Sequence, residues 1–268
     1  MRSPATDKDA RGIQSVEVGL GILFPFLVIP EPLKLREVAE EANVSAAQAH
    51  TYLVSFRRMG LVEQDEKTGK YRLGRFALDL ALARMQSFDP LESAAHLVEM
   101  LRDQSGLTVT LSVFGSFGPT VVMMRDGREQ VYINTRVGTV YSISGTATGM
   151  AFASHMEPDE VKIAIETEKA EPHGYRRVGR VREWDDIQAE FEVIRKRNYA
   201  TIDPNPVAGI AAVASPVFDH SGEVRMIFTL IGTASNPGLA PGSNALHALL
   251  SATTRMSFEL GYIGTDGL

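Results

Sequence analysis

The stretch Leu35–Leu73, LREVAEEANVSAAQAHTYLVSFRRMGLVEQDEKTGKYRL, decides the fold of the first part of the chain. Leu35, Val38, Ala39 and Ala42 recur at steps of three and four residues, which places them on one face of a helix. That face is apolar, so it is expected to be buried. The pattern therefore predicts a short amphipathic helix that begins at Leu35.

A second helix is predicted directly after the first. Asn43 tolerates the left-handed backbone of a tight turn, and Ser45 is placed to cap the next helix by accepting a hydrogen bond from an early backbone N–H. Ala49, Leu53 and Phe56 then share one helical face. The outer positions are mostly polar and uncharged, which suits a helix that enters a groove.

A charged β-hairpin follows the second helix. Gly60 is typical of a helix stop, Leu61-Val62 opens a strand, and Lys70–Leu73 returns across the turn Asp65–Gly69. Two helices and such a hairpin make a winged helix-turn-helix, a fold that usually binds duplex DNA. An ordinary α+β core could show the same spacing, so the pattern alone leaves both interpretations open.

Several side chains of this segment are candidates for DNA contacts. Gln48 is the first choice for a base contact, because its amide can pair with adenine in two places. His50 could instead be a surface histidine, Tyr52 a core residue, and Arg57-Arg58 a solvated helix end favoured by the macrodipole. The candidates are Ala47, Gln48, His50, Thr51, Tyr52, Ser55, Arg57, Arg58, Lys70 and Arg72.

Length and composition indicate two domains. The chain has 268 residues, 44% of them hydrophobic, with a formal net charge of −6 and no cysteine. The sequence contains no run of about 18 apolar residues, so it predicts no membrane span. Residues 1–12 resemble a flexible arm and lack the apolar core of a secretion signal. The absence of cysteine excludes disulfides and cysteine-ligated zinc. We therefore expect a cytoplasmic protein without a membrane partner.

The net charge does not argue against DNA binding, although phosphate contacts normally come from a basic surface. Acidic residues concentrate beyond the hairpin, in the segments 157–160, 166–171 and 183–192. A locally cationic first part can therefore belong to an acidic chain.

The remainder of the chain predicts a linker helix and a second domain. Turn residues separate runs typical of strands from runs typical of helices. Strands are predicted at 108–114, 120–125, 131–135, 212–218 and 225–231, and helices at 75–88, 91–104, 150–154, 157–168, 183–197 and 241–260. This order indicates a mostly antiparallel sheet with helices on its faces.

No catalytic or metal-binding set is visible in the second part. Its serines lack the glycine elbow of a serine hydrolase, and the six histidines lack the spacing of metal ligands. The segment Gly145–Gly149 precedes a predicted helix, so its backbone N–H groups could hold a carboxylate, or it could be a plain loop. We expect neither a cofactor nor a metal.

Separate blocks of the chain resemble the IclR family of bacterial transcriptional regulators, in the family's order and over nearly the whole length. The blocks are Ser15-Val16-Glu17, Leu35–Leu53, Gly69–Gly74, Arg136-Val137-Gly138, Thr146–Gly149 and Gly209–Asp219. The resemblance implies an α+β protein. A flexible arm (1–12) precedes a winged helix-turn-helix domain (13–74), which a linker helix (75–88) joins to a GAF/PAS-like effector-binding domain (89–264) with a mostly antiparallel sheet.

The resemblance also implies a function. We expect a ligand-responsive regulator, a repressor of catabolic genes, that binds double-stranded operator DNA as a homodimer or a dimer of dimers and senses a small carboxylic acid. At Ala46 and Thr51 the family often has a lysine and an arginine, so phosphate contacts should fall to the helix end and the hairpin. The alternative is a metabolite-binding protein or an enzyme whose N-terminal domain mediates only protein contacts.

The expected effector site departs from the family pattern. The family's polar ligand-binding positions match Ile202, Ala212, Thr229 and Ile231 here, and only Thr229 keeps a hydroxyl. Because an unpaired buried polar group costs about 1–3 kcal/mol, we expect an aromatic or otherwise partly apolar acid, with its carboxylate at Gly145-Thr146. The candidate effector-binding residues are Met123, Met124, Ser144, Gly145, Thr146, Ile202, Ala212, Phe228, Thr229 and Ile231.

Overall fold

The computed structural model describes residues 12–129, 133–170, 177–202 and 207–264. The chain forms two compact units, of which the first extends to Asp89 and the second begins at Pro90. The predicted arm, residues 1–12, lies outside the described residues except for Gly12. The predicted domain limits stay predictions.

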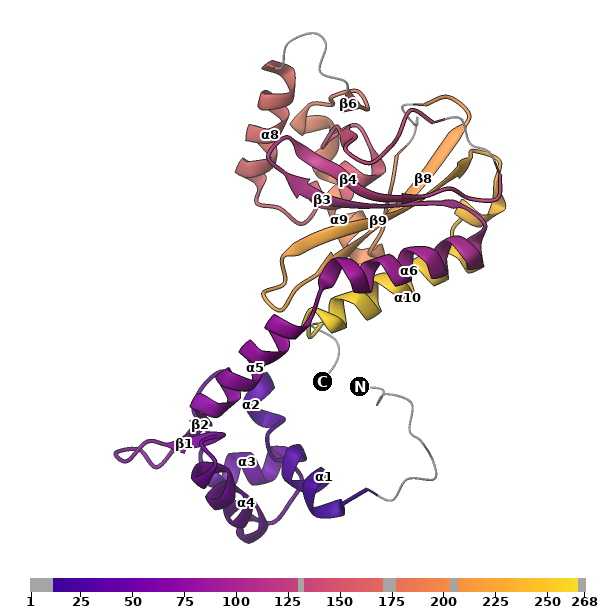
Figure 1. Ribbon diagram of the computed structural model, residues 1–268. Coiled ribbons are helices and arrows are strands. Elements are labelled where there is room, and N and C mark those ends of the chain that lie inside the picture. Colours follow the sequence, from indigo (N-terminus) through magenta and orange to yellow (C-terminus); the bar gives the residue numbers. More distant parts are fainter. Residues whose placement is uncertain (1–11, 130–132, 171–176, 203–206, 265–268) are drawn as a thin grey trace. The chain divides into compact units, whose positions relative to one another are not determined.

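The first unit is helical except for one β-hairpin (Figure 1). Its turns follow the predicted chemistry. Ser45 caps the second predicted helix, its Oγ accepting the N–H of Gln48 at 3.2 Å, while Asn43 and Gly60 adopt φ of 51° and 72°. The elements are α1 (Gln14–Gly21), α2 (Pro25–Val28), α3 (Leu35–Glu41), α4 (Ala46–Arg58), β1 (Val62–Gln64), β2 (Tyr71–Leu73) and α5 (Arg75–Ser87).

The core of the first unit joins α3 and α4 to the hairpin. Val38 and Leu53 are fully buried, and Tyr71 of β2 packs in the same cluster. Leu33 adds a bridge beside the hairpin, because its N–H and carbonyl bond to Tyr71 at 2.9 and 2.7 Å. The winged helix-turn-helix prediction is confirmed.

The second unit is built around a sheet of seven strands in the order β6-β5-β4-β3-β9-β8-β7 (Figure 1). β5 and β6 pair in parallel and the other neighbours are antiparallel. The strands are β3 (Thr108–Gly115), β4 (Gly118–Arg125), β5 (Val140–Tyr141), β6 (Arg177–Val178), β7 (Ala200–Thr201), β8 (Ile210–Phe218) and β9 (Val224–Thr233). The predicted mostly antiparallel sheet is confirmed.

Helices cover both faces of this sheet. α6 (Pro90–Ser105) and α10 (Asn244–Glu259) lie side by side on one face, which we call the α10 side (Figure 1). α7 (Ala147–Ala153), α8 (Pro158–Ala170) and α9 (Trp184–Arg197) cover the other face, the α7 side, where their apolar residues pack against Ala214 and Ile227. A short 3-10 helix, η1 (Pro237–Leu239), precedes α10.

Strand alternation assigns the side chains of β9 to the two faces. Because successive residues of a strand point to opposite faces, Thr229 lies on the α7 side with Ile227. Phe228 points to the α10 side, since its cross-strand partner Ser215 bonds to Thr253 of α10 at 2.9 Å. This alternation determines which predicted site residues can meet.

One sequence-based prediction about the sheet is wrong, and three short strands were missed. In the predicted strand 131–135, residues 133–135 are irregular and residues 131 and 132 lie outside the described residues. The two-residue strands β5, β6 and β7 were not predicted, because a pair of residues is too short to show an alternating pattern.

No helix in the described parts of the chain is long and apolar enough to span a membrane.

Candidate DNA interface and effector cavity

The outer face of α4 carries most of the predicted DNA contacts. Ala49 and Leu53 are buried beneath it, while Gln48, Thr51 and Arg58 are exposed. The exposed candidates on α4 are Ala47, Gln48, His50, Thr51, Ser55, Arg57 and Arg58. The side-chain amide of Gln48 makes no hydrogen bond with the described residues, so it can offer both its oxygen and its nitrogen to a base edge.

Tyr52 lies differently from these residues. It is half-buried and pairs with Phe56, with ring centroids 6.3 Å apart. A Cβ at Gly19 of α1 would meet two ring carbons of Tyr52 at 3.1 Å, so this glycine lets α1 approach the ring closely. Packing between α1 and α4 therefore explains the half-buried position of Tyr52. This agrees with the core interpretation of Tyr52, which the sequence had left open.

The hairpin is held in shape by Asp65, whose carboxylate accepts the backbone N–H of Thr68 at 2.7 Å and that of Lys67 at 3.0 Å. These bonds lower the pKa of Asp65, led by the bond from Thr68. Arg57 reaches the hairpin by donating to Gln64 at 2.8 Å.

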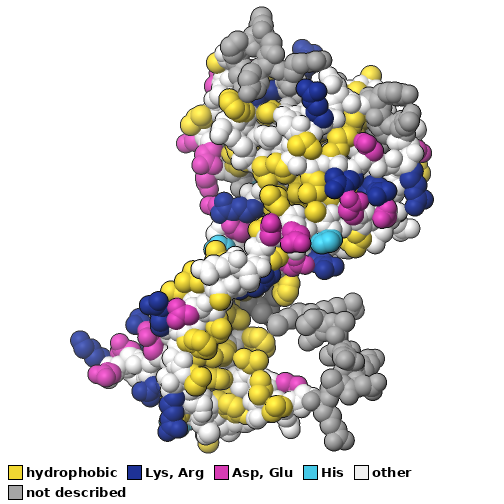
Figure 2. Space-filling model, in the orientation of Figure 1, with side chains coloured by type: hydrophobic (Ala, Val, Ile, Leu, Met, Phe, Trp, Pro, Cys, Tyr) yellow, Lys and Arg dark blue, Asp and Glu magenta, His cyan; other side chains and the backbone are white. Residues whose placement is uncertain are grey.

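The cations of this region differ in their partners. Arg72 pairs with Glu63 across the strands at 2.5 Å, and Arg75 pairs with Asp79 at 3.0 Å. Lysine and arginine side chains gather at the hairpin and along the neighbouring edge of the unit (Figure 2). The predicted candidates Lys70 and Arg72 are both on the return side of the hairpin, so phosphate contacts from it would flank α4.

The second unit contains a partly open cavity of about 70 Å³ on the α7 side of the sheet. Among the described lining residues none is Asp, Glu, Lys or Arg, and aliphatic side chains predominate. The lining residues are Ile133, Asn134, Thr135, Tyr141, Thr146, Ala147, Thr148, Val178, Ile202, Val207, Ile210, Ala212, Thr229 and Ile231.

Five predicted effector-binding residues line this cavity: Thr146, Ile202, Ala212, Thr229 and Ile231. They come from the N-cap of α7, from β8 and β9, and from the segment after β7, so tertiary structure brings together residues separated by up to 85 positions. The prediction missed the other lining residues, which come from the segment 133–135, β5, β6, the first turn of α7, and Val207 and Ile210, just before and at the start of β8. The sequence carried no signal for residues 133–135, β5 and β6, because these segments are too short or too irregular to show a pattern.

The other five predicted residues do not line the cavity. Phe228 and Met123 lie on the α10 side, because Phe228 and Leu111 are cross-strand partners and Leu111 also pairs with Met123. Met124 shares the cavity's side of the sheet through its pairing with Thr110, but it is not among the lining residues.

Ser144 and Gly145 are buried in the loop before α7 and already have partners. The Oγ of Ser144 accepts the N–H of Arg182 at 2.7 Å, and the N–H of Gly145 donates to Ser142 Oγ at 3.0 Å. Gly145 is also packed against backbone, since a Cβ there would lie 2.0 Å from the carbonyl oxygen of Arg180. The Gly145 N–H is therefore engaged within the protein, and a ligand carboxylate would need other donors.

Hydroxyl groups supply most of the polarity of the cavity. The Oγ1 atoms of Thr148 and Thr229 are 2.9 Å apart, and the Tyr141 hydroxyl donates to Thr135 Oγ1 at 3.2 Å. Burial raises the pKa of Tyr141, so its phenol stays protonated at neutral pH. Thr146 caps α7, accepting the N–H of Gly149 at 2.9 Å.

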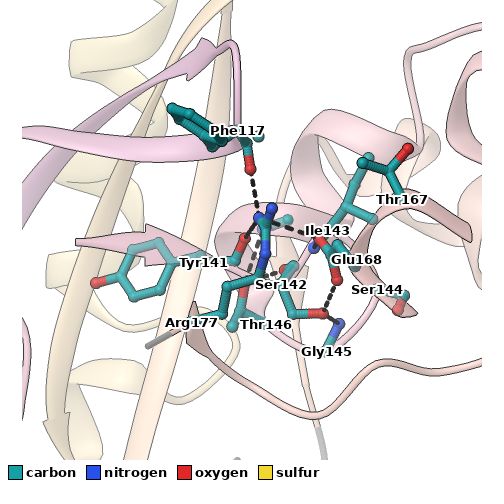
Figure 3. A network of polar contacts seen from close by, with 12 residues as sticks. Phe117, Tyr141, Ser142, Ile143, Ser144, Gly145, Thr146, Thr167, Glu168 and Arg177 are labelled. Atoms are coloured by element: carbon teal, nitrogen blue, oxygen red, sulfur yellow. Dashed lines mark hydrogen bonds and ion pairs between the residues drawn. The ribbon is translucent and has the colours of Figure 1, made fainter. Parts of the chain in front are cut away.

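A buried ion pair supports the loop that forms one wall of the cavity (Figure 3). The side chains of Glu168 and Arg177 are 3% and 8% exposed and lie 3.6 Å apart. Glu168 accepts the hydroxyl of Ser142 at 2.9 Å and the N–H of Ile143 at 2.7 Å. Arg177 donates to the carbonyls of Phe117 and Tyr141.

This network links the turn between β3 and β4, strand β5 and helix α8 at one point (Figure 3). Val178 and Tyr141, which line the cavity, are direct neighbours of its members, and the N–H of Ser142 donates to the Val178 carbonyl at 2.8 Å. Glu168 and Arg177 thus position cavity residues without being among the lining side chains.

Comparison with known families agrees with this two-part architecture. Residues 15–66 match the model of the IclR helix-turn-helix domain, and residues 83–237 match the model of the bacterial transcriptional regulator IclR C-terminal domain. The chain belongs to the IclR family. Members of this family are DNA-binding regulators of transcription, and the resemblance drawn from the separate sequence blocks is confirmed.

Individual IclR-family proteins are similar over most of their length. The crystal structure of HmgR from Pseudomonas aeruginosa is 33% identical, with a TM-score of 0.78, and the match covers 94% of this chain and 100% of that one. The regulator BhcR from Paracoccus denitrificans is 23% identical over 94% of this chain and 89% of its own. The acetate operon repressor of Salmonella typhimurium is 22% identical over 83% of this chain and 81% of its own.

Family membership makes a regulator, and not an enzyme, the expected class of protein. The described residues contain no group of three or more His, Asp or Glu side chains that could hold a metal ion. Which effector such a domain binds depends on the lining of the cavity.

Proposed function

We propose that this protein is a ligand-responsive transcriptional regulator that represses catabolic genes and is released or re-positioned on DNA by a small, partly apolar carboxylic acid. The observation that carries the proposal is a mainly aliphatic cavity in the unit that follows a winged helix-turn-helix. A regulator of this kind works in the cytoplasm.

The cavity favours a partly apolar effector. Ile133, Val178, Ile202 and Ile231 offer aliphatic contacts, and no described lining residue offers a charge to a second carboxylate. Fewer residues than the sequence indicated can contact an aromatic ring of the effector, since Met123 and Phe228 face the α10 side. A single carboxylate can bond to the threonine hydroxyls, which are donors as well as acceptors.

Operator DNA is the proposed macromolecular partner, bound as a homodimer or a dimer of dimers. Exposed apolar side chains on the first unit support self-association, because contiguous apolar surface usually marks an interaction site (Figure 2). They lie on three helices and include Leu20 of α1, Leu27 of α2, and Leu80 and Met85 of α5. Two copies would present two α4 helices to two half-sites.

Regulation requires that the effector bind two states of the protein with different affinity. The proposed experiment therefore couples two measurements on the full chain. Thermal shift with a panel of small carboxylic acids identifies stabilising ligands, and fluorescence anisotropy with the DNA upstream of the protein's own gene measures their effect on binding.

Stabilisation by a partly apolar acid together with a change of at least several-fold in DNA affinity is expected. Stabilisation by glyoxylate or pyruvate alone would contradict the proposed effector class. Turnover of a bound acid without salt-dependent binding to duplex DNA would contradict the regulator itself.

A further inference from the structure

The last turn of α4 carries two adjacent arginines that differ in their surroundings. Arg57 and Arg58 are both exposed. The guanidinium of Arg57 donates to Oε1 of Gln64 in β1 at 2.8 Å, whereas the Arg58 side chain makes no hydrogen bond or ion pair with the described residues. Two cations at neighbouring positions of one helix can therefore have different roles.

Gln64 connects α4 to the turn of the hairpin. Its amide is bonded at both ends, because its oxygen accepts from Arg57 while its nitrogen donates to the Gly69 carbonyl at 2.9 Å. A charged donor strengthens the first bond, and the two bonds together fix the orientation of the amide. We call the chain Arg57–Gln64–Gly69 the α4–turn link.

The turn itself, residues 65–69, is rigid and extends away from the rest of the unit (Figure 1). The Asp65 carboxylate accepts the N–H of Thr68 at 2.7 Å and that of Lys67 at 3.0 Å, and the Asp65 carbonyl accepts the N–H of Gly69 at 2.8 Å. Gly69 has a φ of 70°, which favours glycine. The turn therefore moves as one body.

The base of the hairpin is anchored separately from its turn. Val62 and Tyr71 are buried, and Leu33 bonds to Tyr71 through its backbone. Beyond this base, the hydrogen bonds that connect the turn to α4 within the described residues pass through Gln64. Without the link, the turn would be held only by its own two strands, and an isolated two-stranded hairpin is marginally stable.

The direction of the turn matters because two lysines lie on it or next to it. The side chains of Lys67 and Lys70 make no hydrogen bond or ion pair with the described residues, so their charges are available to phosphates. A group that is already held in its bound position loses less entropy on binding.

We infer that Arg57 and Gln64 are positioning residues. They hold the turn in a fixed direction relative to α4, so that Lys67 and Lys70 reach the phosphates beside the groove that α4 enters, and Arg57 itself makes no phosphate contact. The inference rests on the proposed function, because it concerns the same DNA interface.

Gln64→Met tests the link without changing any charge. Binding of the full-length protein is measured by fluorescence anisotropy at several salt concentrations, with a duplex from upstream of its own gene and with a duplex of arbitrary sequence and equal length. Both affinities are expected to fall roughly 3–10-fold, the range for one lost hydrogen bond. The salt slope is expected to fall by about one, because a lysine leaves its phosphate.

A double-mutant cycle tests whether Arg57 acts through Gln64. Arg57→Met should weaken binding to a similar extent as Gln64→Met. The double variant should bind within about twofold of either single variant, because both substitutions remove the same link.

Arg58→Met is the matched control, since it removes the same charge from the same helical turn. Its effect should add to that of Gln64→Met, because Arg58 is not part of the link. The melting temperature of each variant should stay within about 2 °C of the wild type, since the side chains are exposed or half-buried.

The outcomes separate the inference from the proposed function. If Gln64→Met leaves affinity and salt slope unchanged while Arg57→Met lowers both, Arg57 contacts phosphate directly and the inference is overturned. Additive effects of the two substitutions, or a loss confined to the upstream duplex, overturn it as well and leave a DNA-binding regulator. No salt-dependent binding of the wild type to either duplex contradicts the proposed function and the inference together.

Discussion

The two candidate sites of this molecule differ in how their residues are distributed along the chain. The proposed DNA contacts lie between Ala47 and Arg72, mostly on one helix, whereas the described lining of the cavity extends from Ile133 to Ile231. A face of one helix is determined by local periodicity. A cavity under a sheet is determined by strand order and by which side of the sheet each residue faces, so small errors in the assignment of strands move whole side chains out of it.

The largest expected effect tests the support of the cavity wall. Glu168→Ala removes the carboxylate that lies 3.6 Å from the buried Arg177 and the acceptor for Ser142 and Ile143. Loss of one member of a buried pair costs about 3–5 kcal/mol, measured as the free energy of unfolding in urea. In the double variant with Arg177→Ala the cost should be clearly less than the sum of the two single costs, and simple additivity would contradict a coupled pair.

A glycine-to-alanine substitution is expected to change stability differently in the two units. Gly149→Ala in α7 would bring a Cβ within 2.1 Å of the Ser142 carbonyl oxygen and 2.5 Å of that of Ile143. We expect a loss of about 3 kcal/mol in the free energy of unfolding, since backbone atoms cannot easily move away. Gly21→Ala in α1 is the control, because nothing lies within 4 Å of its Cβ, and a small gain in stability is expected there. Equal effects at the two positions would argue against the tight packing of α7.

The hairpin between β8 and β9 gives a pH-dependent effect that should be confined to the second unit. Asp219 is buried and accepts hydrogen bonds from Ser221 and Arg225. Burial alone would raise the pKa of Asp219, but these bonds outweigh it and lower the pKa from 3.8 to about 2.

The lowered pKa means that folding favours the ionised carboxylate. Its contribution, about 2 kcal/mol, is fully present above about pH 4 and is lost as the pH falls toward 2. Asp219→Asn should therefore be less stable than the wild type at pH 6, with about half of the difference gone at pH 3 in urea unfolding. A difference that does not depend on pH would contradict this assignment.

The smallest expected effects test the division of labour within the first unit. Gln48→Ala should cost about 1–3 kcal/mol for the preferred operator and much less for other duplexes, measured by anisotropy, because a base contact is lost. Arg72→Ala should weaken all duplexes alike and lower the salt slope by about one, and its effect should be modest because Arg72 already pairs with Glu63. Similar sequence dependence in both variants would refute the distinction.

The sequence by itself determined the elements whose patterns are local. The stripe of α3, the Ser45 cap, the stop at Gly60 and the hairpin turn follow from side-chain periodicity and backbone preference within a few residues. The longer strands β3, β4, β8 and β9 were predictable for the same reason. The sequence blocks that resemble the IclR family also predicted the family and five of the residues that line the cavity.

Only the tertiary structure decided the rest. Phe228 and Thr229 are neighbours in sequence, but the pleat sends one toward α10 and the other into the cavity. Tyr52 packs against α1 because Gly19 allows α1 to approach it. The N–H of Gly145 is engaged because it donates to the hydroxyl of Ser142. These outcomes depend on which distant segments meet, and no local pattern encodes the distances between them.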